Sequence, residues 1–352
     1  MGRAPHHTQC WPDAGKARHF PRPAVKRHCR CTTSVSLDSQ DCHSVQSCKF
    51  DLDQGSNANA SAHCGSGLRT QPETIMYKTI VVHLSSSSAI SAALNTAASV
   101  ANSMGAHLIG TTTSGLAELN YVLAAGAPVA MMPVTGIDQL RSDAELRLQA
   151  FRQHCREHGV VSFETRLFDT SPADALLLQS RYCDLLVAGQ EEVSDGSLLI
   201  PAPLPGTLVT RAARPVLLVP PSAPAGPFRK IMIAWNGSPG ISRTIAFAMP
   251  LISRAAKIVV AVCNPESERI DAGGEPGADL ATYLARHHGN VEVVLRDGNE
   301  DTGVELTDLA GEIGADLMLA GAFGHSRLHE WVLGSTTSGL IEGTRIPLLM
   351  TH

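Results

Sequence analysis

Short apolar runs alternate with longer segments of helical periodicity from residue 77 to the end of the chain. The run YKTIVVHL at 77–84 is rich in β-branched residues and is followed by serines, which is typical of a buried strand. The next segment has apolar residues at helical spacing up to Gly105, a residue type that commonly ends helices. Further strands are predicted at 106–110, 160–168, 184–189 and 214–220, helices at 136–158 and 172–182, and a long connection at 111–134. Strands that alternate with helices predict a parallel sheet with helices on both faces.

The same order of elements begins again after a Pro-rich linker at 222–227. Strand-like runs at 229–235, 256–262, 290–297, 315–321 and 345–352 match the strands of the first copy in order. Helices are predicted at 242–255, 277–288 and 302–313, and a mobile stretch at 265–276. A repeat of about 140 residues is too long for a solenoid unit. The sequence therefore predicts an α/β protein with two tandem Rossmann-like domains, 76–221 and 228–352, each a five-stranded parallel sheet with flanking helices.

The first 75 residues differ from the rest of the chain. They are rich in Ser, His, Cys, Arg and Pro and lack aliphatic runs, so they cannot bury enough surface to offset the entropy of ordering. Two interpretations stay open: a disordered tail, or a mis-assigned start, because Met76 directly precedes the first strand. Cys29-x-Cys31 and Cys42-His43 lack the paired spacing of a zinc knuckle, so no metal site is predicted.

Charge and cysteine usage narrow the class of protein. A net charge of −5 gives no electrostatic reason to expect a nucleic-acid or anionic-membrane partner. No apolar run reaches the ~18 residues that a membrane span needs. Of the 9 cysteines, only Cys155, Cys183 and Cys263 lie in the two copies, which favours free thiols in a reducing cytoplasm.

The candidate chemistry follows the fourth strand of the second copy, in DLMLAGAFGHSRLHEWVLGSTTS at 316–338. Two residues separate Gly321 from Gly324, and Gly334 directly precedes Ser335 and Thr336. Glycine lets a backbone approach a phosphate closely, and the first turn of a helix has unpaired N–H groups. The pattern Gly-x2-Gly-x9-Gly-Ser after a buried strand therefore predicts phosphate binding. It is not a Walker A loop, because no Lys follows Gly334, and it is not the dinucleotide pattern Gly-x-Gly-x-x-Gly.

This motif, its flanks GADLMLAGAFGHSRLHEWVLGSTTSGLI and the terminal IPLLMTH resemble the ATP-binding branch of the universal stress protein family. The resemblance covers 76–352 as two tandem copies. It implies that the second copy binds ATP or a related adenine nucleotide, with or without Mg²⁺. By resemblance, the base and ribose would contact Ala234, Trp235, Asn236 and Val262, the ribose and phosphate would contact Gly321, Gly324 and His325, and the phosphates would contact Gly334, Ser335 and Thr336.

The chain departs from the family pattern in two places. ATP-binding members usually have Asp where this chain has Asn236, which keeps an acceptor oxygen and loses the charge. In the first copy, GQEEVSDGSLLIPAPLPGT takes the place of the motif. There Glu191 and Glu192 bring negative charge, and prolines at 201, 203 and 205 remove N–H donors. The first copy is therefore predicted not to bind a nucleotide in the family manner.

Several of these positions also have a purely structural explanation. Trp235 is more typical of an aromatic residue in a core or an interface than of one that stacks on a base. His325 fits an ordinary surface loop. Gly321 fits a tight turn, and Ser335 fits an ordinary helix N-cap. The nucleotide prediction therefore depends on the joint spacing and on no single residue.

Together these features predict a cytoplasmic stress-response protein in which the nucleotide is a signal or a structural ligand. At most slow hydrolysis is expected, with no catalytic or metal-binding residue assigned. Two alternatives stay open: a nucleotide-free protein-interaction module of the same fold, and a slow ATPase. The apolar fifth strands, 214–220 and 345–352, are predicted to pair across the two copies, and a homodimer stays open as well.

Overall fold

The computed structural model describes residues 76–85, 92–124, 136–190, 204–264, 275–297, 301–322 and 335–352. The predicted tail or mis-assigned start at 1–75 lies outside the described residues, as does 265–274, most of the stretch predicted to be mobile.

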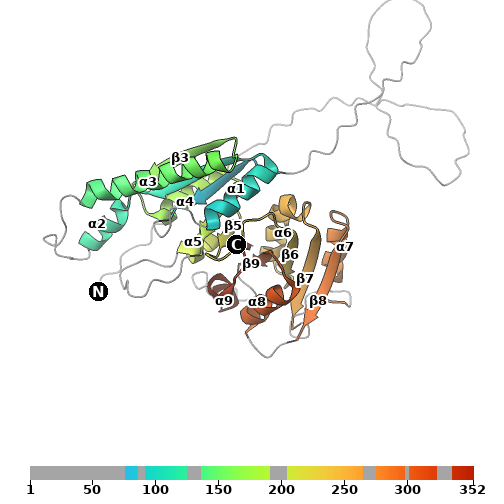
Figure 1. The fold of residues 1–352 in the computed structure, drawn as a ribbon. Coiled ribbons are helices and arrows are strands. Elements are labelled where there is room, and N and C mark those ends of the chain that lie inside the picture. Colours follow the sequence, from blue (N-terminus) through green and yellow to red (C-terminus); the bar gives the residue numbers. More distant parts are fainter. Residues whose placement is uncertain are drawn as a thin grey trace, which may run out of the picture. The chain divides into compact units, whose positions relative to one another are not determined.

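The first half of the described chain alternates strands and helices as predicted (Figure 1). Its strands are β1 (Thr79–His83), β2 (His107–Thr113), β3 (Phe163–Phe168), β4 (Leu185–Gly189) and β5 (Val216–Val219). Its helices are α1 (Ala92–Met104), α2 (Leu116–Ala124), α3 (Gly136–Glu157), α4 (Pro172–Gln179), the 3-10 turn η2 (Ser180–Tyr182) and α5 (Leu204–Arg211).

The second half repeats this order. Its strands are β6 (Lys230–Ala234), β7 (Lys257–Cys263), β8 (Val291–Arg296), β9 (Leu317–Gly321) and β10 (Leu348–Thr351). Its helices are α6 (Pro239–Ile252), α7 (Ala278–Ala285), α8 (Thr302–Ile313) and α9 (Ser335–Gly343).

The two halves form one sheet with the strand order β3-β2-β1-β4-β5-β10-β9-β6-β7-β8. All neighbours within a half are parallel, and the single antiparallel pair joins β5 to β10, with Leu217 opposite Leu349. The predicted pairing of the fifth strands across the copies is therefore confirmed. It buries both apolar edges, which would otherwise offer unpaired N–H and C=O groups to another chain.

In each half, an aspartate carboxylate accepts hydrogen bonds from the backbone at the start of the first strand. The carboxylate of Asp184, just before β4, accepts backbone N–H groups from Lys78 and Thr79 at 2.7 and 2.9 Å. The carboxylate of Asp316, just before β9, accepts them from Arg229 and Lys230 at 2.8 and 3.0 Å. The internal repeat thus extends to individual hydrogen bonds.

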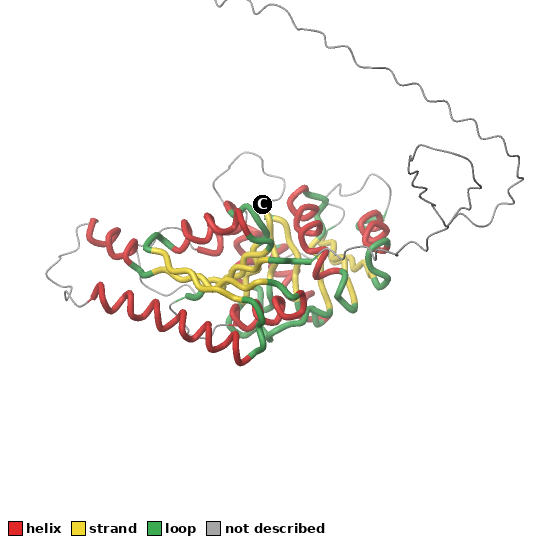
Figure 2. Tube along the Cα trace, turned by 90° about the horizontal axis from the view of Figure 1, so that it is seen from above, coloured by secondary structure: helices red, strands yellow, loops and turns green. Residues whose placement is uncertain are grey.

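Helices cover both faces of the sheet, as Figure 2 shows. The face under α1, α3, α6 and α7 has a fully buried core that includes Ile80, Phe151, Ile233, Leu284 and Leu319. The face under α4, α5, α8 and α9 has a second core that includes Leu186, Leu208, Met232, Leu309 and Met350. Alternate residues of each strand supply the two cores, because successive side chains of a strand point to opposite faces.

Some predicted boundaries were wrong. The predicted connection at 111–134 contains the end of β2 and all of α2, because Thr111–Thr113 continue the pairing with β3. Helix α6 begins three residues before the predicted start, because the Ser238 hydroxyl accepts the N–H of Ile241 and Pro239 takes the first helical position. Propensity patterns miss such ends because capping depends on single side chains.

Candidate functional site

The candidate site lies at the carboxyl ends of β6, β7 and β9, where the order of strands reverses. From β6 the chain crosses through α6 to β7 on one side, and α8 later returns it to β9 on the other side of β6. The register places Ile233 of β6 opposite Leu319 of β9. Ala234, Trp235 and Gly321 therefore flank this reversal point, which is where open parallel sheets bind ligands.

Asn236 forms a turn immediately after β6. Its Oδ1 accepts the backbone N–H of Ser238 at 3.2 Å, and Gly237 between them has a φ of 66°. The acceptor oxygen that the sequence assigned to a ligand is therefore used by the protein's own backbone. Because the accepting atom must be the oxygen, the remaining polar group of Asn236 is its amide nitrogen, a donor.

Gly321 is required by the packing of α6 onto β9. A Cβ built on Gly321 would lie 2.5 Å from the backbone nitrogen of Ile241, and one on Gly240 would lie 3.1 Å from the carbonyl oxygen of Ala322. The Thr244 hydroxyl donates to the Ala320 carbonyl at 3.0 Å and completes this contact. Backbone thus fills the α6 side of the reversal point, so a ligand would approach from the side of α9.

Trp235 is half-buried and packs against the core under α6 and α7. Its backbone N–H donates to the Ala261 carbonyl at 2.9 Å. Its indole Nε1 is buried and has no hydrogen-bond partner among the described residues. An unpaired buried donor costs about 1–3 kcal/mol, and Trp235 packs on the face of α6 and α7, not on the α9 side from which a ligand would approach.

Val262 and Ala234 belong to opposite faces of the sheet. Val262 is fully buried in the core under α6 and α7, and a Cβ on Gly277 would lie 3.2 Å from its side chain. Ala234 is 9% exposed and belongs to the core under α8 and α9, together with Cys263. The structure therefore brings Cys263 to the face of Ala234, and only strand register could have shown this.

The remaining predicted positions surround the start of α9. Gly324, His325 and Gly334 lie outside the described residues. Ser335 is the first residue of α9, as predicted for a helix that follows the motif, and Thr336 is half-buried in its first turn. The carbonyl oxygen of Thr336 would lie 3.2 Å from a Cβ on Gly303, so α8 and α9 are in close contact.

The matching edge of the first half has different chemistry. Glu191 and Glu192 lie outside the described residues, and α5 begins with Leu204 and Pro205, so its first turn has fewer N–H donors. His83, the last residue of β1, occupies the place of Ala234, the last residue of β6, and is 6% exposed. Burial, with a smaller contribution from the cationic Arg147, lowers the pKa of His83 to about 4, so its imidazole is neutral at pH 7.

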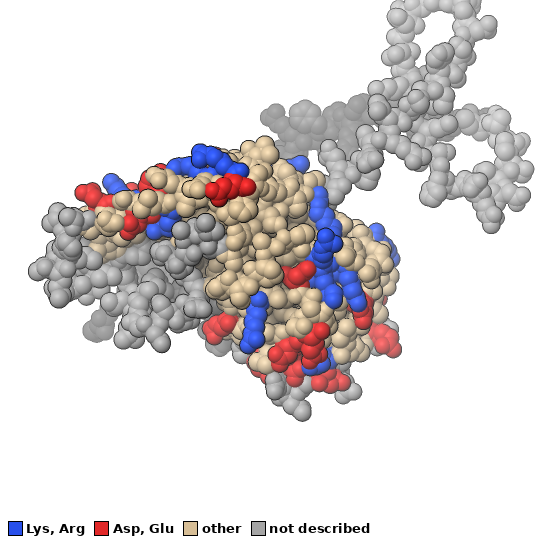
Figure 3. Space-filling model, in the orientation of Figure 1, with Lys and Arg blue, Asp and Glu red and all other residues tan. Residues whose placement is uncertain are grey.

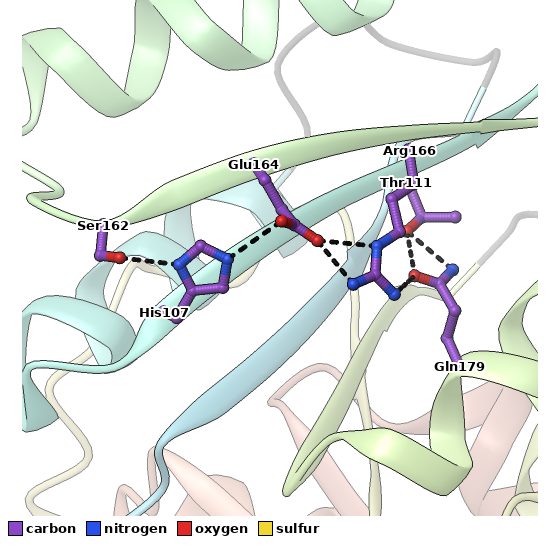
Figure 4. A network of polar contacts seen from close by, with 6 residues as sticks. All are labelled: His107, Thr111, Ser162, Glu164, Arg166 and Gln179. Carbon is purple, nitrogen blue, oxygen red and sulfur yellow. Dashed lines mark hydrogen bonds and ion pairs between the residues drawn. The ribbon is translucent and has the colours of Figure 1, made fainter.

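A chain of polar contacts crosses β2 and β3 in the first half (Figure 4). Ser162 Oγ lies 2.7 Å from His107 Nδ1, and His107 Nε2 lies 3.7 Å from a carboxylate oxygen of Glu164. Arg166 Nη2 lies 2.6 Å from Glu164 Oε1, and Arg166 Nη1 donates a hydrogen bond to Gln179 Oε1. The residue types are those of an acyl-transfer triad, but Ser162 is exposed beside the terminal strand of the sheet and Glu164 is paired with the guanidinium. We interpret the network as a link between β2, β3 and α4.

Two other kinds of feature are absent from the part of the chain that the structure describes. No group of three or more His, Cys, Asp or Glu residues there is arranged to hold a metal ion. No described helix combines the length and apolarity needed to cross a membrane.

Comparisons with known proteins agree with this architecture. The family model described as "Universal stress protein family" matches residues 227–352. A universal stress protein from Archaeoglobus fulgidus DSM 4304 has a similar fold, with a TM-score of 0.58, 14% identity, and coverage of 77% of this chain and 94% of its own. A functionally unknown protein from Pseudomonas aeruginosa PAO1 has a TM-score of 0.50, 18% identity, and coverage of 78% and 92%.

No match to this sequence is found among curated proteins. The two similar structures extend over both halves of this chain, and at these identities they show the fold alone. The family assignment therefore comes from the second half, whose β6–β10 order and motif were described above. The second half of the chain, residues 227–352, therefore belongs to the universal stress protein family.

Proposed function

We propose that the second half binds ATP or a related adenine nucleotide at the carboxyl ends of β6, β7 and β9. The observation that carries the proposal is the position of the motif. Ala234 and Gly321 flank the reversal of strand order, and α9 begins at Ser335, directly after the glycine-containing segment that follows β9. Ligands of open parallel sheets bind at such points, and phosphates bind at helix N-termini.

The residues on the α9 side of this edge suit a flat base and an anionic tail. Ala234 and Cys263 are small side chains of the core under α8 and α9, with exposures of 9% and 8%. The first N–H groups of α9 have no partner within the helix and carry partial positive charge. Asn236 offers its amide N–H₂ as a donor, because its oxygen is already used by Ser238.

The energetics require more than the helix terminus. One helix N-terminus contributes about 0.3–2 kcal/mol toward an anion, whereas micromolar binding needs about 8 kcal/mol. The net charge of the chain is −5, and Figure 3 shows the Lys and Arg side chains of the described residues in separate small groups on the face in view, so the proposal does not rely on a broad positive field. Contacts to the base and ribose must therefore supply most of the affinity.

In this proposal the nucleotide is a signal or a structural ligand of a cytoplasmic stress-response protein. The first half then acts as a structural partner that does not bind nucleotide in the family manner, because its α5 begins with Leu204-Pro205 in place of Ser-Thr. Within this chain, β5 pairs with β10, so each strand covers the edge of the other half's sheet. In a single-domain protein, a separate subunit would have to cover that edge.

The test uses the purified full chain. Mass analysis of co-purified ligand should detect an adenine nucleotide, and calorimetric titration with ATP, with and without Mg²⁺, should show binding. Gly334→Asp should weaken binding about tenfold or more by placing a charge beside the phosphates. The matched control Gly311→Asp lies on α8, where an added Cβ meets nothing within 4 Å, and should bind as the wild type does.

Two results would redirect the proposal. Absence of co-purified nucleotide together with absence of ATP binding would favour the protein-interaction module. Phosphate release well above background in the wild type and lost in Gly334→Asp would favour the slow ATPase.

A further inference from the structure

A cavity far from the nucleotide motif in the sequence lies where the two halves meet. It has a volume of about 180 Å³ and is bounded by the C-terminal part of α1, the C-terminal end of α6 and the segment that enters β6. Both halves therefore contribute to its walls. Most of its lining is apolar and comes from Val100, Met104, Pro227, Phe228, Leu251 and Ala256.

The hydroxyl donors in the lining are already used. Ser99 Oγ donates to the Gly226 carbonyl at 3.1 Å, and Ser103 Oγ donates to the Val100 carbonyl at 2.9 Å. The Ser99 contact also fixes the linker between the halves onto α1. The donors that remain for a ligand are therefore those of the two lining arginines, Arg229 and Arg254.

These two arginines are exposed residues and are the charged side chains in the lining of the cavity. Neither forms an ion pair with a described residue, and the lining contains no acidic side chain. Arg254 gives one hydrogen bond, from Nη1 to the Pro250 carbonyl at 3.3 Å, which leaves other N–H groups of its guanidinium available. A guanidinium with unused donors matches the two oxygens of a carboxylate.

We propose that this cavity binds a small amphipathic carboxylate, with its apolar tail between α1 and α6 and its head group on Arg229 and Arg254. A water occupies about 30 Å³, so the cavity equals about six waters and suits an aliphatic acid of about eight carbons. It is smaller than the ~300–1,000 Å³ of sites for drug-sized ligands, which excludes a nucleotide. The ligand would contact both halves and stabilise their association.

Octanoate is the probe, added to the full chain and followed by calorimetry and by the methyl NMR signal of Met104. Octanoate should bind and shift this signal. Octanol, which has the same tail without the charge, should bind at least about tenfold more weakly. Equal binding of octanol, or an unchanged Met104 signal at saturating octanoate, would overturn the proposal.

Variants separate the head-group site from the tail site. The double change Arg229→Gln and Arg254→Gln should weaken octanoate binding about tenfold or more, whereas Arg181→Gln, an exposed arginine on η2, should leave it unchanged. Ser103→Phe, at an exposed position on α1, should fill the cavity and abolish binding while circular dichroism stays native. Octanoate binding at wild-type strength in the double variant or in Ser103→Phe would contradict the assignment.

Discussion

The phenol of Tyr77 donates a 2.8 Å hydrogen bond to the backbone carbonyl of Phe247, a residue 170 positions away in the other half. Tyr77 is 4% exposed, and burial raises its pKa well above the usual value, so the phenol remains a donor at all ordinary pH values. The contact joins the segment before β1 to the middle of α6. Together with the β5–β10 pairing, it makes the two halves one structural unit.

Removing this hydroxyl should therefore destabilise the whole protein. Tyr77→Phe keeps the ring but leaves the Phe247 carbonyl without its donor, so we expect the free energy of unfolding to fall by about 1–3 kcal/mol. Denaturation in urea, followed by circular dichroism, measures this change. Tyr182→Phe is the control, because Tyr182 is 74% exposed and should change stability by less than about 0.5 kcal/mol. Equal effects of the two substitutions would show that the cross-half bond does not contribute.

Gly321→Ala tests whether this glycine serves packing. The new Cβ would lie 2.5 Å from the backbone nitrogen of Ile241, so α6 must shift and stability should fall by about 1–3 kcal/mol even without nucleotide. Gly311→Ala is the matched control inside α8, where the Cβ meets nothing within 4 Å. It should raise stability by about 0.5–1 kcal/mol, because alanine is the better helix former. If Gly321→Ala did not change the free energy of unfolding, packing would not explain why this position is glycine, and close approach of a nucleotide would be the remaining explanation.

His83 should make the protein less stable in weak acid. The unfolded chain protonates this imidazole below about pH 6.5, whereas the folded chain does so only below about pH 4. The unfolded state therefore binds more protons between these values, so stability is complete above pH 6.5 and is lost as the pH falls toward 4. The loss from this group is up to about 3 kcal/mol.

The measurement is the free energy of unfolding at several pH values between 7 and 4 in the wild type and in His83→Gln. The variant should lose less stability over this range than the wild type, whatever its stability at pH 7. His287→Gln, at an exposed position, should retain the wild-type profile. Parallel profiles for the wild type and His83→Gln would refute the assignment.

Two cysteines should react with thiol reagents only when the protein unfolds. Burial raises the pKa of Cys155 and of Cys183 to about 12, so almost no thiolate is present at pH 8. Peptide mass analysis after brief alkylation should find both residues unmodified in native protein and modified in guanidinium chloride. Modification of either residue at the same rate in both conditions would contradict its burial in a stable core.

Particular residues show how far the sequence could predict this protein. The alternating pattern predicted the positions of all ten strands now described, and the motif correctly predicted a helix after β9. The pattern did not predict α2, because nothing in 111–134 separates a short helix from a connection without its neighbours. The family resemblance grouped Val262 with Ala234, and only the packing of β7 beside β6 shows that the two side chains lie on opposite faces of the sheet.

The sequence by itself determined the repeated α/β order, the apolar fifth strands and the glycine motif, since each is a local pattern of side-chain type. The tertiary structure alone decided that β5 meets β10 antiparallel, that Gly321 accommodates the backbone of α6, and that two arginines border a cavity between the halves. The physical reason is distance along the chain. These contacts join residues about 80 to 150 positions apart, and periodicity reports only which side of an element is buried, not what covers it.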